Sequence, residues 1–246
     1  IVVILLEIIG LIPFLKPYSA SILTSDFFTA VFTIYVLVRM KKRRELSLYK
    51  PPVFTKISIT AFVLLILFIV TLQYGVIDPI HAMMPDFDEI PLFKDMFEEL
   101  LKNIENELIG YTLSAIILAP ILEEYMYREL MLNGLMKSYS PAKALFISTF
   151  IFAFVHLNPW QFVTAMLLGY LLGWIYIRTR SYWLCVIVHM LNNAVPMLGG
   201  LMVEDDFKLP TWVVLIMLAL VVPLFYLLRQ KLPRVSSVDE SVNSVE

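Results

Sequence analysis

The chain has 246 residues, of which 59% are hydrophobic and only 16% are charged, and its mean hydropathy is +0.79. This composition excludes an ordinary soluble domain and predicts an all-α fold, a polytopic bundle of transmembrane helices. The 19 Lys and Arg and the 21 Asp and Glu nearly cancel, leaving a net charge of −2. We find no Gly-rich phosphate loop or nucleic-acid-binding motif in the sequence, so no nucleic-acid partner is expected.

Apolar windows along the chain predict about eight spans. Six are long enough to cross about 30 Å of hydrocarbon at about 1.5 Å per residue. They are residues 22–40, 56–76, 109–130, 160–178, 182–200 and 210–229. Two shorter windows, 1–15 and 142–157, complete the set. The first has no signal-peptide cleavage site and no initial Met, so we interpret it as a retained and truncated span.

The distribution of basic residues tests this arrangement, because Lys and Arg collect in cytoplasmic loops. With these spans, 14 of the 19 basic residues fall on one side. They are Arg39, Lys41, Lys42, Arg43, Arg44, Lys50, Lys56, Lys137, Lys143, Arg178, Arg180, Arg229, Lys231 and Arg234. Both termini are therefore predicted to be cytoplasmic, in a multi-pass protein that we expect in a prokaryotic cell membrane. Arg178 and Arg180 are interpreted first as anchors of this topology.

Residues 78–107 form one long polar interruption between the predicted spans. Between Phe93 and Leu108 the apolar residues recur at helical spacing, which predicts an amphipathic helix. Such a helix could act as a gate at the membrane surface or simply be solvated, and the pattern fits both. His81, in the same external loop, is expected to be solvated.

Ionisable residues appear inside the predicted span 109–130, as Glu123, Glu124 and Arg128. Such groups cost several kcal/mol in a membrane unless they face water or one another, so function is the first hypothesis. Glu124 and Arg128 are four residues apart and can pair on one helix face. Glu123 points about 100° away without that partner, which makes it the candidate general base. Pro120 should free a backbone carbonyl and bend the helix nearby.

Two later spans also carry polar groups. His189 and Asn193 repeat the four-residue spacing, and as neutral hydrogen-bond donors they are suited to stabilising an oxyanion. His156 closes the window 142–157 just before Asn158-Pro159, where it could bind a water jointly with Glu123. The histidines could equally be helix–helix hydrogen-bonding residues. Asn192 points away from Asn193 and is left outside the predicted site.

Taken together, the three motifs resemble those of the CPBP (CAAX protease and bacteriocin-processing, or Abi) family, which includes the Ras-converting CAAX endopeptidase. The motifs are E-E-x-x-x-R at Glu123, Glu124 and Arg128, F-x-x-x-H at Phe152 and His156, and H-x-x-x-N at His189 and Asn193. They occur in the family's order on three predicted helices. Together with the apolar windows and the polar tail, the resemblance divides the chain into N-terminal spans with an external amphipathic segment (1–104), a catalytic core (105–200), a last span (201–234) and a disordered cytoplasmic tail (235–246).

The resemblance implies an intramembrane endopeptidase of the glutamic type acting on a membrane-associated protein or peptide. Glu123 would activate water with His156, and His189 with Asn193 would form the oxyanion hole. Glu124, Arg128 and Phe152 would support them, and no cofactor is expected. The alternative is a zinc protease in which Glu123, His156 and His189 bind the metal, although the sequence has no H-E-x-x-H motif.

The sequence does not select one substrate or one functional class. CAAX-type, pheromone-like and bacteriocin-like substrates are all compatible with the resemblance, and a compact prokaryotic member would disfavour prenylated ones. A non-catalytic immunity protein that binds a membrane peptide is an alternative of another class. A secondary transporter with a Glu and His proton relay is a third, but the spans show no two-fold repetition. Cys185, the one cysteine, is expected to be a small buried hydrophobe.

Overall fold

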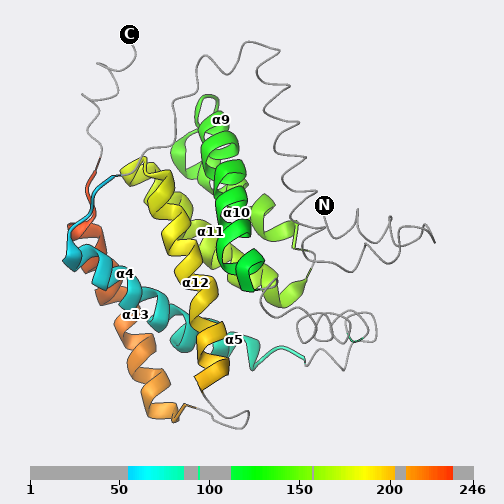
Figure 1. The fold of residues 1–246 in the computed structure, drawn as a ribbon, viewed down its shortest axis with the longest axis vertical. Helices are drawn as coiled ribbons and strands as arrows, with labels where there is room; N and C mark the ends of the chain where they lie inside the picture. Colours follow the sequence, from blue (N-terminus) through cyan, green and yellow to red (C-terminus); the bar gives the residue numbers. More distant parts are fainter. Residues whose placement is uncertain (1–54, 86–93, 95–111, 157, 203–208, 235–246) are drawn as a thin grey trace.

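The structure is a computed structural model that describes residues 55–85, 94, 112–156, 158–202 and 209–234 (Figure 1). All regular elements in these ranges are helical, which confirms the predicted all-α bundle. The first group is α4 (Ile59–Leu72), a π-helical stretch (Gln73–Ile77) and α5 (Asp78–His81). A second continuous run contains η4 (Ser114–Leu118, π-helical), α8 (Ala119–Glu124), η5 (Tyr125–Leu132, π-helical) and α9 (Asn133–Met136). Then follow α10 (Pro141–Phe154), α11 (Pro159–Thr179), α12 (Tyr182–Met202) and α13 (Thr211–Lys231).

Four segments of the described chain are long and apolar enough to cross a membrane. They are Ile59–His81, Pro159–Thr179, Tyr182–Gly199 and Thr211–Lys231. α10 is apolar but has only 14 residues. The predicted windows 1–15 and 22–40, the amphipathic segment apart from Lys94, and the tail 235–246 lie outside the described residues. The four segments match four of the predicted windows.

Local sequence signals explain where α11 begins and ends. The Asn158 side chain accepts the backbone N–H groups of Trp160 and Gln161 at 2.9 and 3.1 Å, and Pro159 occupies the first turn, where its missing N–H costs nothing. At the other end Arg180 adopts a left-handed conformation with φ 51°. The predicted break at Asn158-Pro159 is therefore confirmed.

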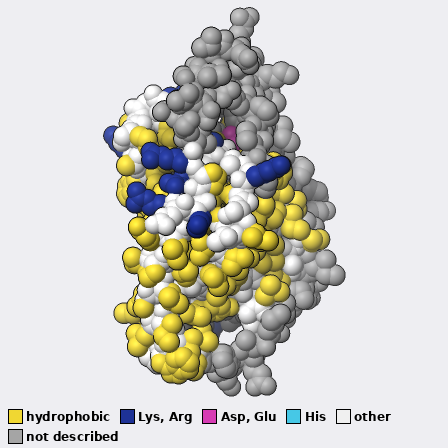
Figure 2. Space-filling model, turned by 90° about the vertical axis from the view of Figure 1, so that its left-hand side faces the viewer, with side chains coloured by type: hydrophobic (Ala, Val, Ile, Leu, Met, Phe, Trp, Pro, Cys, Tyr) yellow, Lys and Arg dark blue, Asp and Glu magenta, His cyan; other side chains and the backbone are white. Residues whose placement is uncertain are grey.

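The basic regions meet at one end of the bundle. The Thr55 N–H donates to Ser181 Oγ at 2.9 Å, which joins the chain entering α4 to the α11–α12 turn. Arg178 Nε donates to the Leu232 carbonyl at 3.2 Å, just past α13, and Arg180 Nη1 donates to Asn133 Oδ1 at 3.1 Å on α9. Figure 2 shows Lys and Arg side chains gathered in a band beside a large apolar surface. The described basic loops thus lie together, as charge alternation predicted, whereas the side that faces the cytoplasm remains a prediction.

α11 forms the centre of the packed core. Leu172 and Ile175 are fully buried in the cluster that joins it to α4 and α12. Gly169 and Gly173 face α10, where an added Cβ at Gly173 would collide with the Leu145 side chain. The close contact of α10 with α11 therefore depends on these small residues.

Candidate active site

The two adjacent glutamates end a short α-helix of six residues that lies between two π-helical stretches. α8 carries Glu123 and Glu124 at its end, with η4 before it and η5 after it. π-Helical turns are rare and often occur at functional sites. Pro120 explains the first π-helical stretch, η4, because proline has no N–H and interrupts the regular hydrogen-bond ladder.

The carbonyl left free near Pro120 is taken up by another helix. The Ala119 N–H bonds to the Ser114 carbonyl, five residues back, so Pro120 in the same register would have to donate to Ala115. Proline has no N–H, and instead Asn193 Nδ2 donates to the Ala115 carbonyl at 2.8 Å. The predicted free carbonyl is therefore present at Ala115, where it joins the glutamate segment to α12, whereas the bend stays a prediction.

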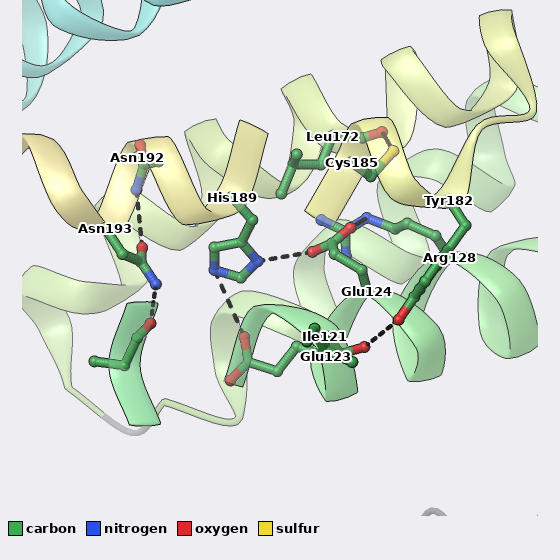
Figure 3. A network of polar contacts seen from close by, with 11 residues as sticks. Ile121, Glu123, Glu124, Arg128, Leu172, Tyr182, Cys185, His189, Asn192 and Asn193 are labelled. Atoms are coloured by element: carbon green, nitrogen blue, oxygen red, sulfur yellow. Dashed lines mark hydrogen bonds and ion pairs between the residues drawn. The ribbon is translucent and has the colours of Figure 1, made fainter. Parts of the chain in front are cut away.

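Glu124 is the centre of the buried polar network (Figure 3). Its side chain is fully buried, with Oε2 3.0 Å from Arg128 Nε and Oε1 2.9 Å from His189 Nδ1. The predicted Glu124–Arg128 ion pair therefore forms, and His189 is a second partner. Arg128 has a side chain only 1% exposed, so its charge is compensated inside the protein by Glu124.

Glu123 lies on the other side of the His189 ring. Its Oε2 is 3.8 Å from His189 Nε2, too long for a hydrogen bond, and its side chain is 25% exposed (Figure 3). A water molecule placed beside these two atoms could contact both. Glu123 is thus the glutamate with access to solvent, as expected of a general base, and Glu124 is the structural partner.

The contacts of His189 change one detail of the predicted chemistry. An ionised Glu124 can only accept hydrogen bonds, so the proton of a neutral His189 resides on Nδ1. Nε2 then has a lone pair and faces Glu123. With this tautomer the single N–H of a neutral His189 is already bonded, so donation from Nε2 requires the protonated ring, and the role of His189 in an oxyanion hole stays a prediction.

Phe152 connects His156 to the rest of the site. Its ring lies 4.8 Å from the Arg128 guanidinium carbon, and its centroid is 5.9 Å from that of His189. The His156 ring is 5.2 Å from the same phenyl ring, and its Nδ1 is 2.8 Å from the Phe152 carbonyl. The structure thus gathers all three motifs, although the contacts of His156 go to Phe152 and the water shared with Glu123 remains a prediction.

The position of His156 is explained by the length of its helix. A regular span through 142–157 would place His156 far from the glutamates, near the opposite membrane surface. α10 instead ends at Phe154, after about 20 Å of rise, and its last turn packs against Arg128 and His189 through Phe152. The predicted boundary was wrong, because the helix ends before His156.

Two further residues of α12 belong to this network, and sequence reasoning did not select them. Tyr182 donates its hydroxyl to the Ile121 carbonyl at 2.7 Å, and its ring packs edge-on against Tyr125 at 6.1 Å. Tyr182 precedes His189 by seven residues, so both share one helix face with Asn193, and this spacing could have indicated it. Asn192, which was placed outside the site, donates Nδ2 to Asn193 Oδ1 at 3.3 Å.

The alternative zinc ligands do not converge. Glu123, His156 and His189 are all described, yet the described part of the chain contains no group of three His, Cys, Asp or Glu side chains that could hold a metal ion. Both histidines are bonded through Nδ1, which leaves Nε2 with the lone pair that a metal needs, so zinc is disfavoured by the placement of the three side chains and not by their bonding. As arranged here, the three side chains do not fit a zinc site.

Two predictions outside the site have different outcomes. His81 was expected to be solvated, but it is half-buried at the end of α5, with Nε2 3.0 Å from the Trp160 carbonyl and 3.3 Å from Thr164 Oγ1. That prediction was wrong, because α5 packs against the start of α11. Cys185 is fully buried and donates to the Leu172 carbonyl, so its interpretation as a small buried residue is confirmed.

Comparison with known proteins agrees with the geometry. Residues 105–195 match the family model described as "Type II CAAX prenyl endopeptidase Rce1-like". The matched range contains all three motifs and the α8–α12 contacts. A 78-residue stretch is 29% identical to "Putative membrane peptidase YdiL" of Bacillus subtilis, and covers 32% of this chain and 32% of that protein. No solved structure shows significant similarity to the chain.

Proposed function

Because residues 105–195 match the model of a CAAX endopeptidase family, we propose that this chain belongs to that family and is an intramembrane endopeptidase that hydrolyses a peptide bond of a membrane-associated protein or peptide. One observation carries the proposal: His189 lies between a buried, charge-compensated Glu124 and a partly exposed Glu123. A hydrolase needs a base with access to water, held beside groups that do not move. The bilayer is the environment of both enzyme and substrate.

Glu123 is the general base in this mechanism. A water beside Glu123 Oε2 loses a proton to the carboxylate as its oxygen attacks the peptide carbonyl carbon. His156 assists: a carbonyl can only accept, so its Nδ1 carries the proton shared with Phe152, and Nε2 is left with a lone pair for the same water.

Asn193 and His189 stabilise the oxyanion that forms when the carbonyl π bond breaks. Asn193 has two N–H bonds on Nδ2, of which one is used by the Ala115 carbonyl and the other can donate to the oxyanion. His189 contributes in its protonated form, through Nε2–H, while Glu124 accepts from Nδ1–H. One such donor typically contributes a factor of about 10² to 10³ to kcat.

Collapse of the tetrahedral intermediate completes the reaction. The carbonyl re-forms, the C–N bond breaks, and the leaving amine takes the proton that Glu123 received from water. Atoms and charges balance with water as the only co-reactant, and none of the proposed steps uses a metal. Glu124, Arg128 and Phe152 act by holding His189 and the helix in position.

The substrate is proposed only as a class: a CAAX-type, pheromone-like or bacteriocin-like peptide segment at the membrane. We further propose that the basic end of the bundle faces the cytoplasm, because Lys and Arg collect on that side of membrane proteins.

Cleavage of a membrane-peptide library by the purified protein tests the proposal. Wild type and Glu123→Gln are compared in detergent, with and without a zinc chelator. Glu123→Gln is nearly isosteric and leaves the Glu124–Arg128 pair intact. We expect it to fold like the wild type, so it serves as the matched control for activity. Cleavage by the wild type that is lost in Glu123→Gln and resists the chelator is the expected result.

Other outcomes favour the alternatives. Activity that is lost to the chelator and restored by zinc would replace the metal-free mechanism with the metal-dependent one. Peptide binding without cleavage, equal in wild type and Glu123→Gln, would favour a non-catalytic peptide-binding protein.

A further inference from the structure

Asn193 can stabilise an oxyanion only if its carboxamide has the correct orientation. The Nδ2 end donates hydrogen bonds and the Oδ1 end repels a developing negative charge. On a helix facing a polar cavity, an asparagine side chain could turn either end toward the substrate. Something in the structure must therefore select the orientation.

Two partners select it in this molecule. The Ala115 carbonyl can only accept, and it lies 2.8 Å from Asn193 Nδ2. The amide of Asn192 lies 3.3 Å from Asn193 Oδ1 and donates to it through Nδ2 (Figure 3). If the Asn193 amide were reversed, it would set two acceptors against each other at Ala115 and, with Asn192 oriented as it is here, two donors against each other at Asn192.

The contact between Asn192 and Asn193 is not a routine result of helix geometry. Consecutive residues on a helix point about 100° apart and do not normally face each other. Asn192 is also buried, with 6% of its surface exposed, where a polar side chain needs a partner. With Ala115 accepting from Nδ2 and Asn192 donating to Oδ1, one of the two N–H groups of Asn193 Nδ2 is left for a further acceptor.

We propose that Asn192 is a positioning residue, which fixes the Asn193 carboxamide with Nδ2 toward the reacting carbonyl. The inference rests on the proposed endopeptidase function and extends it to a residue outside the three motifs. Asn192 itself does not touch the substrate. Its effect therefore passes entirely through Asn193, and it changes the rate of the chemical step without changing substrate binding.

A double-mutant cycle on the purified full-length protein tests this, with the best substrate from the peptide library. Asn192→Asp keeps the side-chain shape but replaces the donor with an acceptor facing Oδ1. We expect it to lower kcat by about tenfold or more, with KM within about twofold of the wild type, because it disturbs one oxyanion donor. In an Asn193→Ala background the same substitution should change kcat by less than about twofold, because its target is gone.

Asn192→Ala serves as the second variant, because it removes the donor without burying a carboxylate. We expect a smaller decrease in kcat with the same dependence on Asn193. The inference is overturned if neither Asn192 variant lowers kcat, or if each lowers it by the same factor in both backgrounds. Wild-type cleavage by Asn193→Ala would also overturn it; if Glu123→Gln were still inactive, the endopeptidase itself would stand.

Discussion

α12 and α13 have the same length and very different roles. Each has 21 residues and an interior proline, Pro196 or Pro223, and each contains a segment apolar enough to span a membrane. The spanning segment of α12 is 39% buried and its inner face presents Tyr182, His189 and Asn193 to the glutamate helix. In α13 only 6% of the spanning segment is buried inside the protein, and large apolar side chains such as Val222 face outward.

The comparison separates two demands on a membrane helix. Both helices can lie in the bilayer, because their backbone groups are hydrogen-bonded within the helix and their side chains are mostly apolar. Tyr182, His189 and Asn193 of α12 each contact a residue between Ala115 and Glu124. In α13, by contrast, the Arg229 carbonyl accepts from Arg178 at the basic end of the bundle, away from the glutamates. The proposed site therefore lies on one face of α12, on the segment that this face contacts and at the end of α10.

The largest expected effect on stability comes from Glu124→Gln. It leaves the buried Arg128 charge without its anion, and breaking a buried ion pair in this way costs about 3–5 kcal/mol. Unfolding in mixed micelles should show this decrease in the free energy of unfolding. Glu123→Gln is the matched control, expected within about 1 kcal/mol of the wild type. Equal destabilisation by the two variants would contradict the division of roles between the glutamates.

His189→Ala should have the largest effect on activity among the polar residues of α12. It removes a proposed oxyanion donor, so kcat should fall by about 10² to 10³. Initial-rate measurements across substrate concentrations give kcat and KM separately. An unchanged kcat would show that the His189 ring does not take part in the reaction.

Tyr182→Phe should have an intermediate effect. The lost hydroxyl bond to the Ile121 carbonyl is worth about 0.5–1.5 kcal/mol, and the segment carrying the glutamates should become less well positioned. We expect a decrease in kcat of a few-fold, measured on the same substrate. Tyr226→Phe, on the exposed face of α13, is the control and should behave like the wild type. Equal effects of the two changes would contradict the proposal that α12 positions the glutamate segment and α13 does not.

Val222→Ala should have the smallest effect. This side chain is 75% exposed on α13, so no cavity forms and the free energy of unfolding should stay within about 0.5 kcal/mol of the wild type. Thermal unfolding in detergent and the cleavage rate would both be compared with the wild type. A large loss in either would mean that α13 has a packed partner on this face.

Local spacing predicted the parts of the site that lie within one helix. The Glu124–Arg128 pair follows from a separation of four residues, and the isolation of Glu123 follows from the helical angle. The common face of His189 and Asn193 follows in the same way. Such inferences need no knowledge of how helices pack.

Contacts between helices could not be predicted in the same way. His189 bonds to Glu124 across 65 positions and Asn193 bonds to Ala115 across 78, and no local pattern encodes these distances. The π-helical stretches around α8 were also missed, because apolar periodicity was read with 3.6 residues per turn. The end of α10 was also mispredicted, because the apolar window 142–157 extends past Phe154, where the helix ends.

The pairing of Arg128 with Glu124 has a consequence for the response to membrane potential. The pair cancels its own charge, and the only charge that moves in the proposed reaction is a proton near Glu123. The Glu123–His189 separation of 3.8 Å is a small fraction of a hydrocarbon core of about 30 Å. Moving a proton over that fraction through 100 mV changes its energy by about 0.3 kcal/mol at most. Turnover by this enzyme should therefore be nearly independent of voltage, whereas a proton-coupled transporter built on the same residues would depend on it strongly.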